Sequence, residues 1–327
     1  AYVAKKRETG TYLSVLGFGR GNLDDAIMQS LAQNGNGTAA YIDTLSEARK
    51  VLVDQLTGAL FPIADDVKIQ VEWNPAAGYI QEGIMETIDA VVNMAGATTG
   101  KIPWTAKYKE EIVSSRLDST RTLVKAMAAA KRRPSVLVSG SASGFYGDTG
   151  EKILHETAPK GTGFLSDLAH EWEQEALKAP TDVRVVLART TMVMSRKLGA
   201  LGRLLPLIKL GIGGPLGSGK QWWAWISLPD EAAAIIHLIK TPTAKGAYNL
   251  TAPEPATCGQ IVKALAKDLK RPSLIAVPTF ALKAFIGEAA VELLLCSQNM
   301  SADRLLATGF KFQHPTLASA AAWVVGK

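Results

Sequence analysis

The feature of this sequence that most constrains its fold is an alternation of short apolar runs with longer amphipathic stretches. Six runs rich in β-branched residues predict β-strands, at residues 11–17, 39–43, 67–73, 90–96, 134–140 and 183–190. Helical patterns lie between them, at 23–33, 46–60, about 107–130 and 163–177. Strands that alternate with helices in this way are parallel and are joined by right-handed crossovers. The sequence therefore predicts a doubly wound parallel α/β sheet, in which 11–17 pairs with 90–95.

Composition and charge limit the classes of partner. The chain has 327 residues, of which 47% are hydrophobic and 20% charged, as in soluble globular proteins. Its net charge of +6 is distributed along the chain, and the longest basic run is Lys131–Arg133. Nucleic-acid binding usually needs a concentrated basic face, so we expect a small-molecule partner and no nucleic acid.

The sequence also indicates a location and the state of its cysteines. No apolar run reaches the roughly 18 residues of a membrane span, and the opening AYVAKKRETG lacks an apolar signal core. We therefore expect a cytoplasmic protein with no membrane partner. The four histidines have no metal-ligand spacing, so no metal site is expected. Cys258 and Cys296 are the only cysteines, and we expect both to be buried free thiols.

A glycine-rich turn follows the first predicted strand. Gly17, Gly19 and Gly21 stand between this strand and a helix, and Asp43 ends the next strand. The layout is typical of a dinucleotide site, with bare backbone beside the pyrophosphate, a helix N-terminus for its charge and a carboxylate for the ribose. The third glycine is displaced from the usual spacing, and Asp24–Asp25 places negative charge at the helix start. An ordinary strand–helix turn is the alternative interpretation.

Motifs from Trp73 to the C-terminus resemble those of one known family. They are WNPAAG (73–78), DAVVNMAGA (89–97), the W-T-x-x-Y-K…I-x-x-S-R run (104–116), FYGDTG (145–150), GGPLGSGKQWWAWI (213–226), TAPEP (251–255) and LLATGFKFQHPTL (305–317). The chain is here similar to the atypical short-chain dehydrogenase/reductases of the nucleoside-diphosphate-sugar epimerase-like family. The resemblance implies a Rossmann-like fold with NADP or NAD as cofactor. The chain departs from the family at Ser227–Asp230, where the family usually reads His-x-Asp-Asp, and this affects how the loop is anchored.

The first part of the chain resembles a different family. Residues 1–74, with VLGFGRGNLDDAIMQSLAQNGNGTAAYID at their centre, look like the C-terminal half of a bacterial von Willebrand factor A domain. That family's metal-binding Asp-x-Ser-x-Ser strand is absent from this sequence, so no metal-dependent adhesion is implied. We therefore expect a chimeric chain. Residues 1–76 replace the first half of the Rossmann-like sheet, 77–196 form its second half, and 197–327 form a smaller substrate-side lobe.

The epimerase-like resemblance also implies that the ends of later strands contact the cofactor, at Asn93, Ala95, Gly96, Ser139, Arg189 and Thr190. The turn pattern adds Gly17, Gly19, Gly21 and Asp43 to the cofactor residues. The predicted substrate residues are Trp222 and Trp225 by resemblance, Arg116 as part of a family motif, and Lys220 as a charge that can neutralise a phosphate. Asp43 would repel the 2′-phosphate of NADP and thus favours NAD, whereas the resemblance favours NADP.

The usual acid/base pair of these enzymes is missing. A Tyr followed four residues later by Lys should lie on the helix at 163–177, which contains neither residue type. The remaining catalytic candidates are Ser141, by resemblance, and Tyr146, as a substitute acid. A tyrosine near its reference pKa of about 10 is a slow acid/base at neutral pH.

Two functions stay open. The first is an epimerase-like enzyme that acts on an unknown small substrate, for which a nucleotide-linked compound is one interpretation. The second is a non-catalytic nucleotide-binding or partner-binding protein.

Overall fold

The computed structural model describes residues 13–18, 36–42, 84–196 and 199–326, which belong to two compact units, residues 1–78 and 79–327. In the first unit, β1 (Leu13–Phe18) and β2 (Asn36–Ile42) form a parallel pair in which Leu16 lies opposite Ala40. Both strands were predicted. The third predicted strand and the helices at 23–33 and 46–60 lie outside the described residues.

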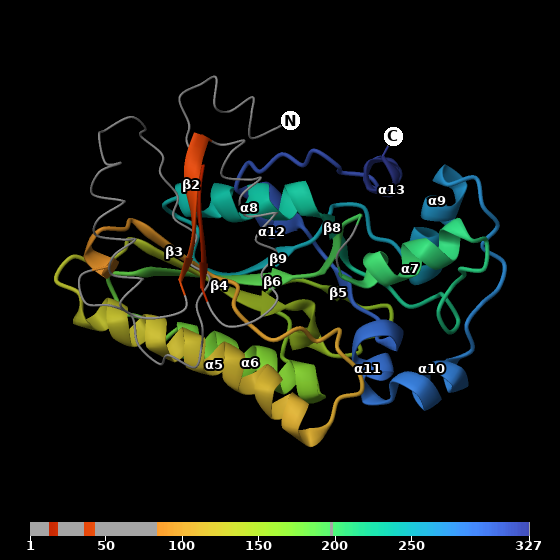
Figure 1. Ribbon diagram of the computed structural model, residues 1–327, viewed down its shortest axis with the longest axis horizontal. Helices are drawn as coiled ribbons and strands as arrows, with labels where there is room; N and C mark the ends of the chain where they lie inside the picture. The colour runs from red at the N-terminus through yellow and green to blue at the C-terminus, as the bar shows by residue number, and fades with distance from the viewer. Residues whose placement is uncertain (1–12, 19–35, 43–83, 197–198, 327) are drawn as a thin grey trace. The chain divides into compact units, whose positions relative to one another are not determined.

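The second unit contains a parallel sheet of four strands in the order β3-β4-β6-β9 (Figure 1). Three of these strands confirm the sequence prediction, and β9 was not predicted. Their bounds are β3 (Ala90–Asn93), β4 (Val136–Ala142), β6 (Arg184–Thr190) and β9 (Gly246–Leu250). The pairing of 11–17 with 90–95 joins the two units and stays a prediction.

Helices cover both faces of this sheet. Figure 1 shows α5 (Ala106–Ala129) and α6 (Phe164–Ala176) on one face and α8 (Leu228–Lys240) on the other. On β4, Leu137 packs in the cluster beneath α5, whereas Val138 packs in the cluster beside α8. Because both faces are buried, the strand begins with a continuous apolar run, Val136–Val138, rather than an alternating one.

The rest of the second unit forms a C-terminal lobe. Here β7 pairs in parallel with β8, and α7, α9 and α13 surround a second apolar core. The bounds of these and the remaining elements are β5 (Ile153–Leu154), β7 (Met192–Met194), α7 (Gly199–Lys209), β8 (Trp225–Ser227), α9 (Cys258–Asp268), α10 (Thr279–Ile286), α11 (Glu288–Ala290), β10 (Asn299–Met300), α12 (Asp303–Ala307) and α13 (Leu317–Val325), with short helices η3 (Ile84–Glu86) and η4 (Ser143–Tyr146) and the π-helix η5 (Val291–Leu295).

Ser227 and Asp230 anchor the loop in which this chain departs from the family pattern. The Ser227 hydroxyl caps α8 by accepting from the backbone N–H of Asp230, and it donates to Asp230 Oδ2 over 2.8 Å. Asp230 in turn accepts the backbone N–H groups of Gln313 (2.7 Å) and His314 (2.9 Å). The Asp230 carboxylate, held by Ser227, thus joins the start of α8 to the C-terminal segment.

The cysteines differ in burial, and the sequence expectation is only half right. Cys258 is the first residue of α9 and is buried, which raises the pKa of its thiol to about 11. Cys296 is only partly buried and directly follows η5. Burial still raises the pKa of its thiol, to about 12. Both are free cysteines, and neither is a reactive thiolate at neutral pH.

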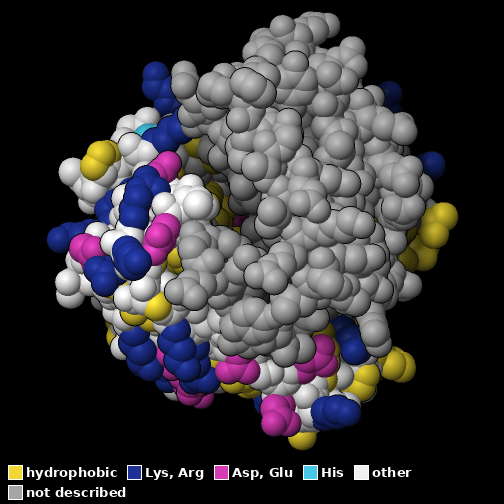
Figure 2. Space-filling view, turned by 60° about the vertical axis from the view of Figure 1, so that its left-hand side comes forward, with side chains coloured by type: hydrophobic (Ala, Val, Ile, Leu, Met, Phe, Trp, Pro, Cys, Tyr) yellow, Lys and Arg dark blue, Asp and Glu magenta, His cyan; other side chains and the backbone are white. Residues whose placement is uncertain are grey.

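Charges on the described surface are mixed, as the sequence indicates. On the left-hand and lower parts of the face in Figure 2, Lys and Arg side chains lie among Asp and Glu side chains. No cluster of metal-ligating side chains occurs among the described residues. Within the same part of the chain, no helix combines the length and apolar character needed to cross a bilayer.

Candidate functional site

The carboxyl ends of the parallel strands gather polar side chains at one edge of the sheet. Asn93 of β3 lies opposite Ser139 of β4, and Ser141 lies opposite Arg189 of β6. Arg189 lies opposite Asn249 on β9. In open α/β sheets, ligands bind at this edge. The structure thus brings together the site residues that the sequence placed at three strand ends.

A buried ion pair lies at the centre of this edge. The guanidinium of Arg189 meets the carboxylate of Glu173 on α6 through two bonds, Nε to Oε1 (2.8 Å) and Nη2 to Oε2 (2.9 Å). Both side chains are about 5% exposed. The guanidinium also stacks on the Phe145 ring, 3.6 Å from the ring centroid. A bidentate pair of this geometry fixes α6 against the end of β6.

The two predicted catalytic hydroxyls join this ion pair. Ser141 Oγ donates to Glu173 Oε1 over 2.7 Å. Arg189 Nη1 donates to the Tyr146 hydroxyl (2.8 Å), which itself donates to Asn249 Oδ1 (2.7 Å). We call these five residues the Arg189 network. All five are buried, so the hydroxyls are held by protein partners and have little access to solvent.

Burial changes the acidity of Tyr146 in a direction that the sequence did not anticipate. Desolvation raises the pKa of its hydroxyl above the ordinary value of 10, although the charge and hydrogen bond of Arg189 act to lower it. The expectation of a tyrosine near its reference pKa is therefore wrong, because the side chain was assumed to be solvated. At neutral pH, Tyr146 is a weaker acid than a free tyrosine.

Two members of the network were missed by sequence analysis. Glu173 lies within a helix that was predicted, and a signal for it existed, because a buried arginine at a strand end requires a carboxylate partner. Asn249 lies on β9, which was not recognised as a strand. Asn249 also donates from Nδ2 to the Leu154 carbonyl (3.0 Å), which ties β5 to the sheet.

The other face of the same strand end holds a second carboxyl group. Thr190 Oγ1 donates to Glu231 Oε1 of α8 over 2.7 Å. Glu231 Oε2 is buried without a hydrogen-bond partner in the described part of the chain. Burial raises the pKa of Glu231 to about 7, and the Thr190 hydrogen bond lowers it only in part. Sequence analysis predicted a role for Thr190 but did not identify Glu231.

The turn after β3 presents nearly bare backbone. Asn93 is buried; its Nδ2 donates to Thr120 Oγ1 (2.9 Å), and its Oδ1 accepts the N–H of Ala95 (3.2 Å). Gly96 is exposed, and a Cβ there would lie 2.8 Å from Arg116 Cζ. Only glycine therefore allows Arg116 to pack beneath this turn. The backbone of 95–96 remains accessible to a ligand.

The sequence could not decide whether Arg116 is bonded within the protein or presented to a ligand. Its Nη1 donates to the carbonyl oxygens of Ala97 (3.0 Å) and Ile112 (2.9 Å). Burial lowers the pKa of its guanidinium, while the nearby Tyr108 hydroxyl raises it. The described contacts hold Arg116 to the turn after β3. Its predicted contact with substrate stays a prediction.

The tryptophan-rich loop is divided between the surface and the core. Trp222 is half-buried, donates to Glu151 Oε2 (2.6 Å) and lies near Thr251 and Met300. Lys220 is exposed on the same loop. Trp225 is fully buried in the core of the C-terminal lobe, with no partner for its Nε1 among the described residues. Its predicted contact with substrate stays a prediction.

Several predicted site residues lie outside this geometry. Gly17 is part of β1 in the first unit, and Gly19, Gly21 and Asp43 fall outside the described residues. Ser139 is fully buried and donates to the Gly140 carbonyl over 3.2 Å. The cofactor roles of these residues stay predictions.

Comparisons with family models and with known proteins point to the same family. Residues 31–251 match the NAD dependent epimerase/dehydratase family, and residues 277–324 match a domain of unknown function, DUF1731. Epimerase family protein ML0860 of Mycobacterium leprae is 36% identical over 252 residues, or 77% of this chain and 81% of the relative. The chloroplastic SDR39U1 homolog of Arabidopsis thaliana is 40% identical over 227 residues, or 69% of this chain and 65% of the relative.

Comparison with solved structures is consistent with this family. The crystal structure of human epimerase family protein SDR39U1 with NADPH aligns with a TM-score of 0.72 at 27% identity, covering 95% of this chain and 99% of that one. None of these matches supports the resemblance of residues 1–74 to a von Willebrand factor A domain. The epimerase/dehydratase match begins at residue 31, inside that stretch. The inference of a chimeric chain is therefore without support.

Glu173→Gln should destabilise the protein by about 3–5 kcal/mol, because it leaves the buried Arg189 guanidinium without its counter-charge. Urea denaturation followed by circular dichroism measures the loss. Asp167→Asn is the matched control, since Asp167 pairs with Lys160 at the exposed surface and should cost about 1 kcal/mol or less. Equal losses in the two variants would contradict the central role of the Glu173–Arg189 pair.

Glu231→Gln should flatten the pH dependence of stability. The folded pKa of Glu231 (about 7) exceeds its ordinary value of 4.5, so the unfolded state loses this proton first as pH rises. The wild-type free energy of unfolding should thus fall relative to the variant between pH 5 and 8, by about 2.5 kcal/mol. Denaturant titrations at both pH values measure this; parallel losses in both proteins would contradict the buried carboxyl.

Proposed function

This chain belongs to the NAD dependent epimerase/dehydratase family, and on that premise we propose that it binds NADPH or NAD along the carboxyl edge of its parallel sheet. The proposed reaction is an epimerase-like or reductase-like conversion of a small substrate, of the nucleotide-linked class. The observation that supports it best is the convergence of polar strand ends at one edge. The NADPH in the human SDR39U1 structure supports the choice of cofactor.

The described residues fit one part of a dinucleotide. The backbone of Ala95 and Gly96 is free of bulky side chains, so a planar or ribose group could approach it closely. Asn93 shapes this turn through its own hydrogen bonds. Thr190, a partly exposed residue, lies at the end of β6, two strands from β3 in the sheet. The nicotinamide group would supply hydride acceptance or donation when bound.

The protein's own contribution to chemistry centres on the Arg189 network. Ser141 and Tyr146 remain the proposed proton donors, and Arg189 and Glu173 hold both hydroxyls in place. To act on substrate, Ser141 must exchange its bond to Glu173 for a bond to the substrate oxygen. The raised pKa of Tyr146 makes it a slow donor at neutral pH. We therefore propose an enzyme with low turnover.

The second candidate function is a non-catalytic nucleotide-binding or partner-binding protein. The closed Arg189 network favours it, because each catalytic candidate is buried and already bonded within the protein. The absence of the Tyr-x-x-x-Lys pattern from α6 favours it as well. Cofactor binding without turnover would distinguish this candidate from the enzyme.

We expect NADPH and NADH to quench the tryptophan fluorescence of the protein in a saturable manner, with little discrimination between them. Asp43→Ala should strengthen NADPH binding, because it removes a carboxylate that would repel the 2′-phosphate. Trp222→Phe serves as the control that assigns the signal to the tryptophan-rich loop. Micromolar NADPH affinity that Asp43→Ala leaves unchanged would mean that Asp43 does not set specificity, and failure to saturate would overturn cofactor binding.

Turnover should lie well below the usual range of roughly 1–1000 per second. A panel of nucleotide sugars, assayed by cofactor absorbance and by epimer analysis, measures it. Ser141→Ala and Tyr146→Phe should each reduce whatever activity is found, while Ser143→Ala, next to the network but outside it, should not. Activity that survives both substitutions together would show that the catalytic groups lie elsewhere.

A further inference from the structure

One side of the C-terminal lobe exposes large apolar side chains. Leu274, Phe280 and Phe285 are 89%, 76% and 87% exposed. They and their neighbours form what we call the apolar patch, which consists of Leu207, Leu210, Ile212, Leu274, Ile275, Phe280 and Phe285. The two phenylalanines alone expose roughly 200–400 Å². A contiguous apolar surface of several hundred Å² marks an interaction site on a folded protein.

The patch comes from two segments of the chain that lie side by side. Leu216 and Val277 form a parallel β-bridge. Val277 N–H donates to the Pro215 carbonyl (2.9 Å), and Gly217 N–H donates to the Val277 carbonyl (2.8 Å). The segment 271–278 thus runs beside 211–217. Figure 1 shows α7 and α10 at the same end of this unit, where the two segments lie.

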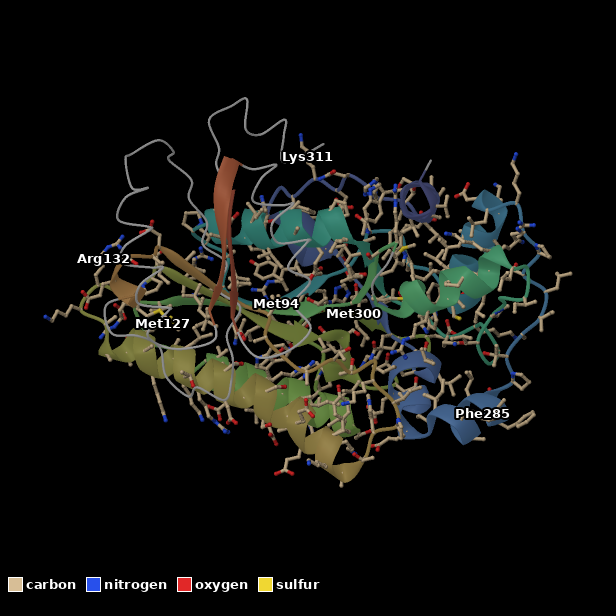
Figure 3. All side chains as sticks on the ribbon, in the orientation of Figure 1. Met94, Met127, Arg132, Phe285, Met300 and Lys311 are labelled. Carbon is tan, nitrogen blue, oxygen red and sulfur yellow. The ribbon has the colours of Figure 1, made fainter. Side chains whose placement is uncertain are left out.

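Helix α10 projects from the lobe rather than packing into it. Leu282 is its one buried residue. At about 100° per residue, Phe280, Ala281, Ala284 and Phe285 fall within an arc of about 140° on the remaining surface. Figure 3 shows the Phe285 side chain pointing outward from the helix. These side chains protrude, so a surface that they can enter suits them better than a rigid flat partner.

Positive charge accompanies the apolar side chains. The segments 207–214 and 270–286 contain four basic residues and no Asp or Glu. The basic residues, all exposed, are Lys209, Lys270, Arg271 and Lys283. Such a surface complements a negatively charged partner, and it disfavours a second copy of itself because like charges would meet across a two-fold interface.

We propose that the apolar patch docks this protein on the surface of an anionic lipid bilayer. Phe280, Phe285 and Leu274 would enter the boundary between head groups and acyl chains. The four basic residues would contact the anionic head groups, as in amphipathic helices that lie in the membrane interface. No spanning helix is needed for this mode. The sequence expectation of no membrane partner rested on the absence of a span, so it did not address surface docking.

Vesicle co-sedimentation of the full chain tests the proposal. It should bind vesicles of equal phosphatidylcholine and phosphatidylglycerol, bind weakly to phosphatidylcholine alone, and release as salt rises. Phe280→Ser with Phe285→Ser should weaken binding at least tenfold. Lys209→Glu with Lys283→Glu should weaken it at least twentyfold, at about fivefold per lost positive charge.

Matched controls separate the patch from general effects. Ile153→Ser with Leu177→Ser removes exposed apolar side chains elsewhere, and Lys125→Glu with Lys311→Glu makes the same charge change elsewhere. Both should bind vesicles like the wild type. Thermal melting verifies that each variant folds. NADPH titration is independent of the patch, so failure of the cofactor proposal would be distinguishable.

Three results would overturn the proposal. The first is absence of binding to anionic vesicles, and the second is equal binding to neutral and anionic vesicles. The third is a dimer, seen by light scattering after size exclusion, that the double phenylalanine variant converts to a monomer while vesicle binding is absent. That last result would identify a second copy as the occupant.

Discussion

The Glu173–Arg189 ion pair is the interaction on which the functional edge of this protein depends. It joins α6 to the end of β6, and through Ser141, Tyr146 and Asn249 it reaches β4, η4 and β9. Taking both charges out of water is costly, so the pair is stable only with its full set of hydrogen bonds. The same bonds that fix the edge also occupy the hydroxyls that chemistry would require.

Two neighbouring residues of β6 lie on opposite faces of the sheet and have different partners. Arg189 points to the α6 face, where its charge is fully paired, whereas Thr190 points to the α8 face and bonds a carboxyl with a free oxygen. Burial raises the pKa of Glu231 to about 7. One strand end therefore combines a fully hydrogen-bonded ion pair with a buried carboxyl whose pKa is raised.

Sequence analysis recovered the elements that periodicity specifies. The strands at 90–96, 134–140 and 183–190 and the helices at 107–130 and 163–177 all lie where apolar spacing placed them, within a few residues. It missed β9 because GAYNL is short and follows a segment of changed composition. It did not anticipate the full burial of Trp225, because spacing does not reveal which face of a short strand turns inward. It misjudged the acidity of Tyr146 because acidity depends on burial.

The sequence by itself determined the fold class, the strand ends that meet at one edge and the absence of the Tyr-x-x-x-Lys pair, since all of these follow from local pattern and from the geometry of parallel strands. Only the tertiary structure decided how the charges at that edge are paired. Glu173 and Arg189 are 16 residues apart, and Tyr146 and Asn249 are 103 apart. Contacts over such separations depend on tertiary packing. Packing also determines how deeply Tyr146 and Glu231 are buried, and their burial determines their proton affinity.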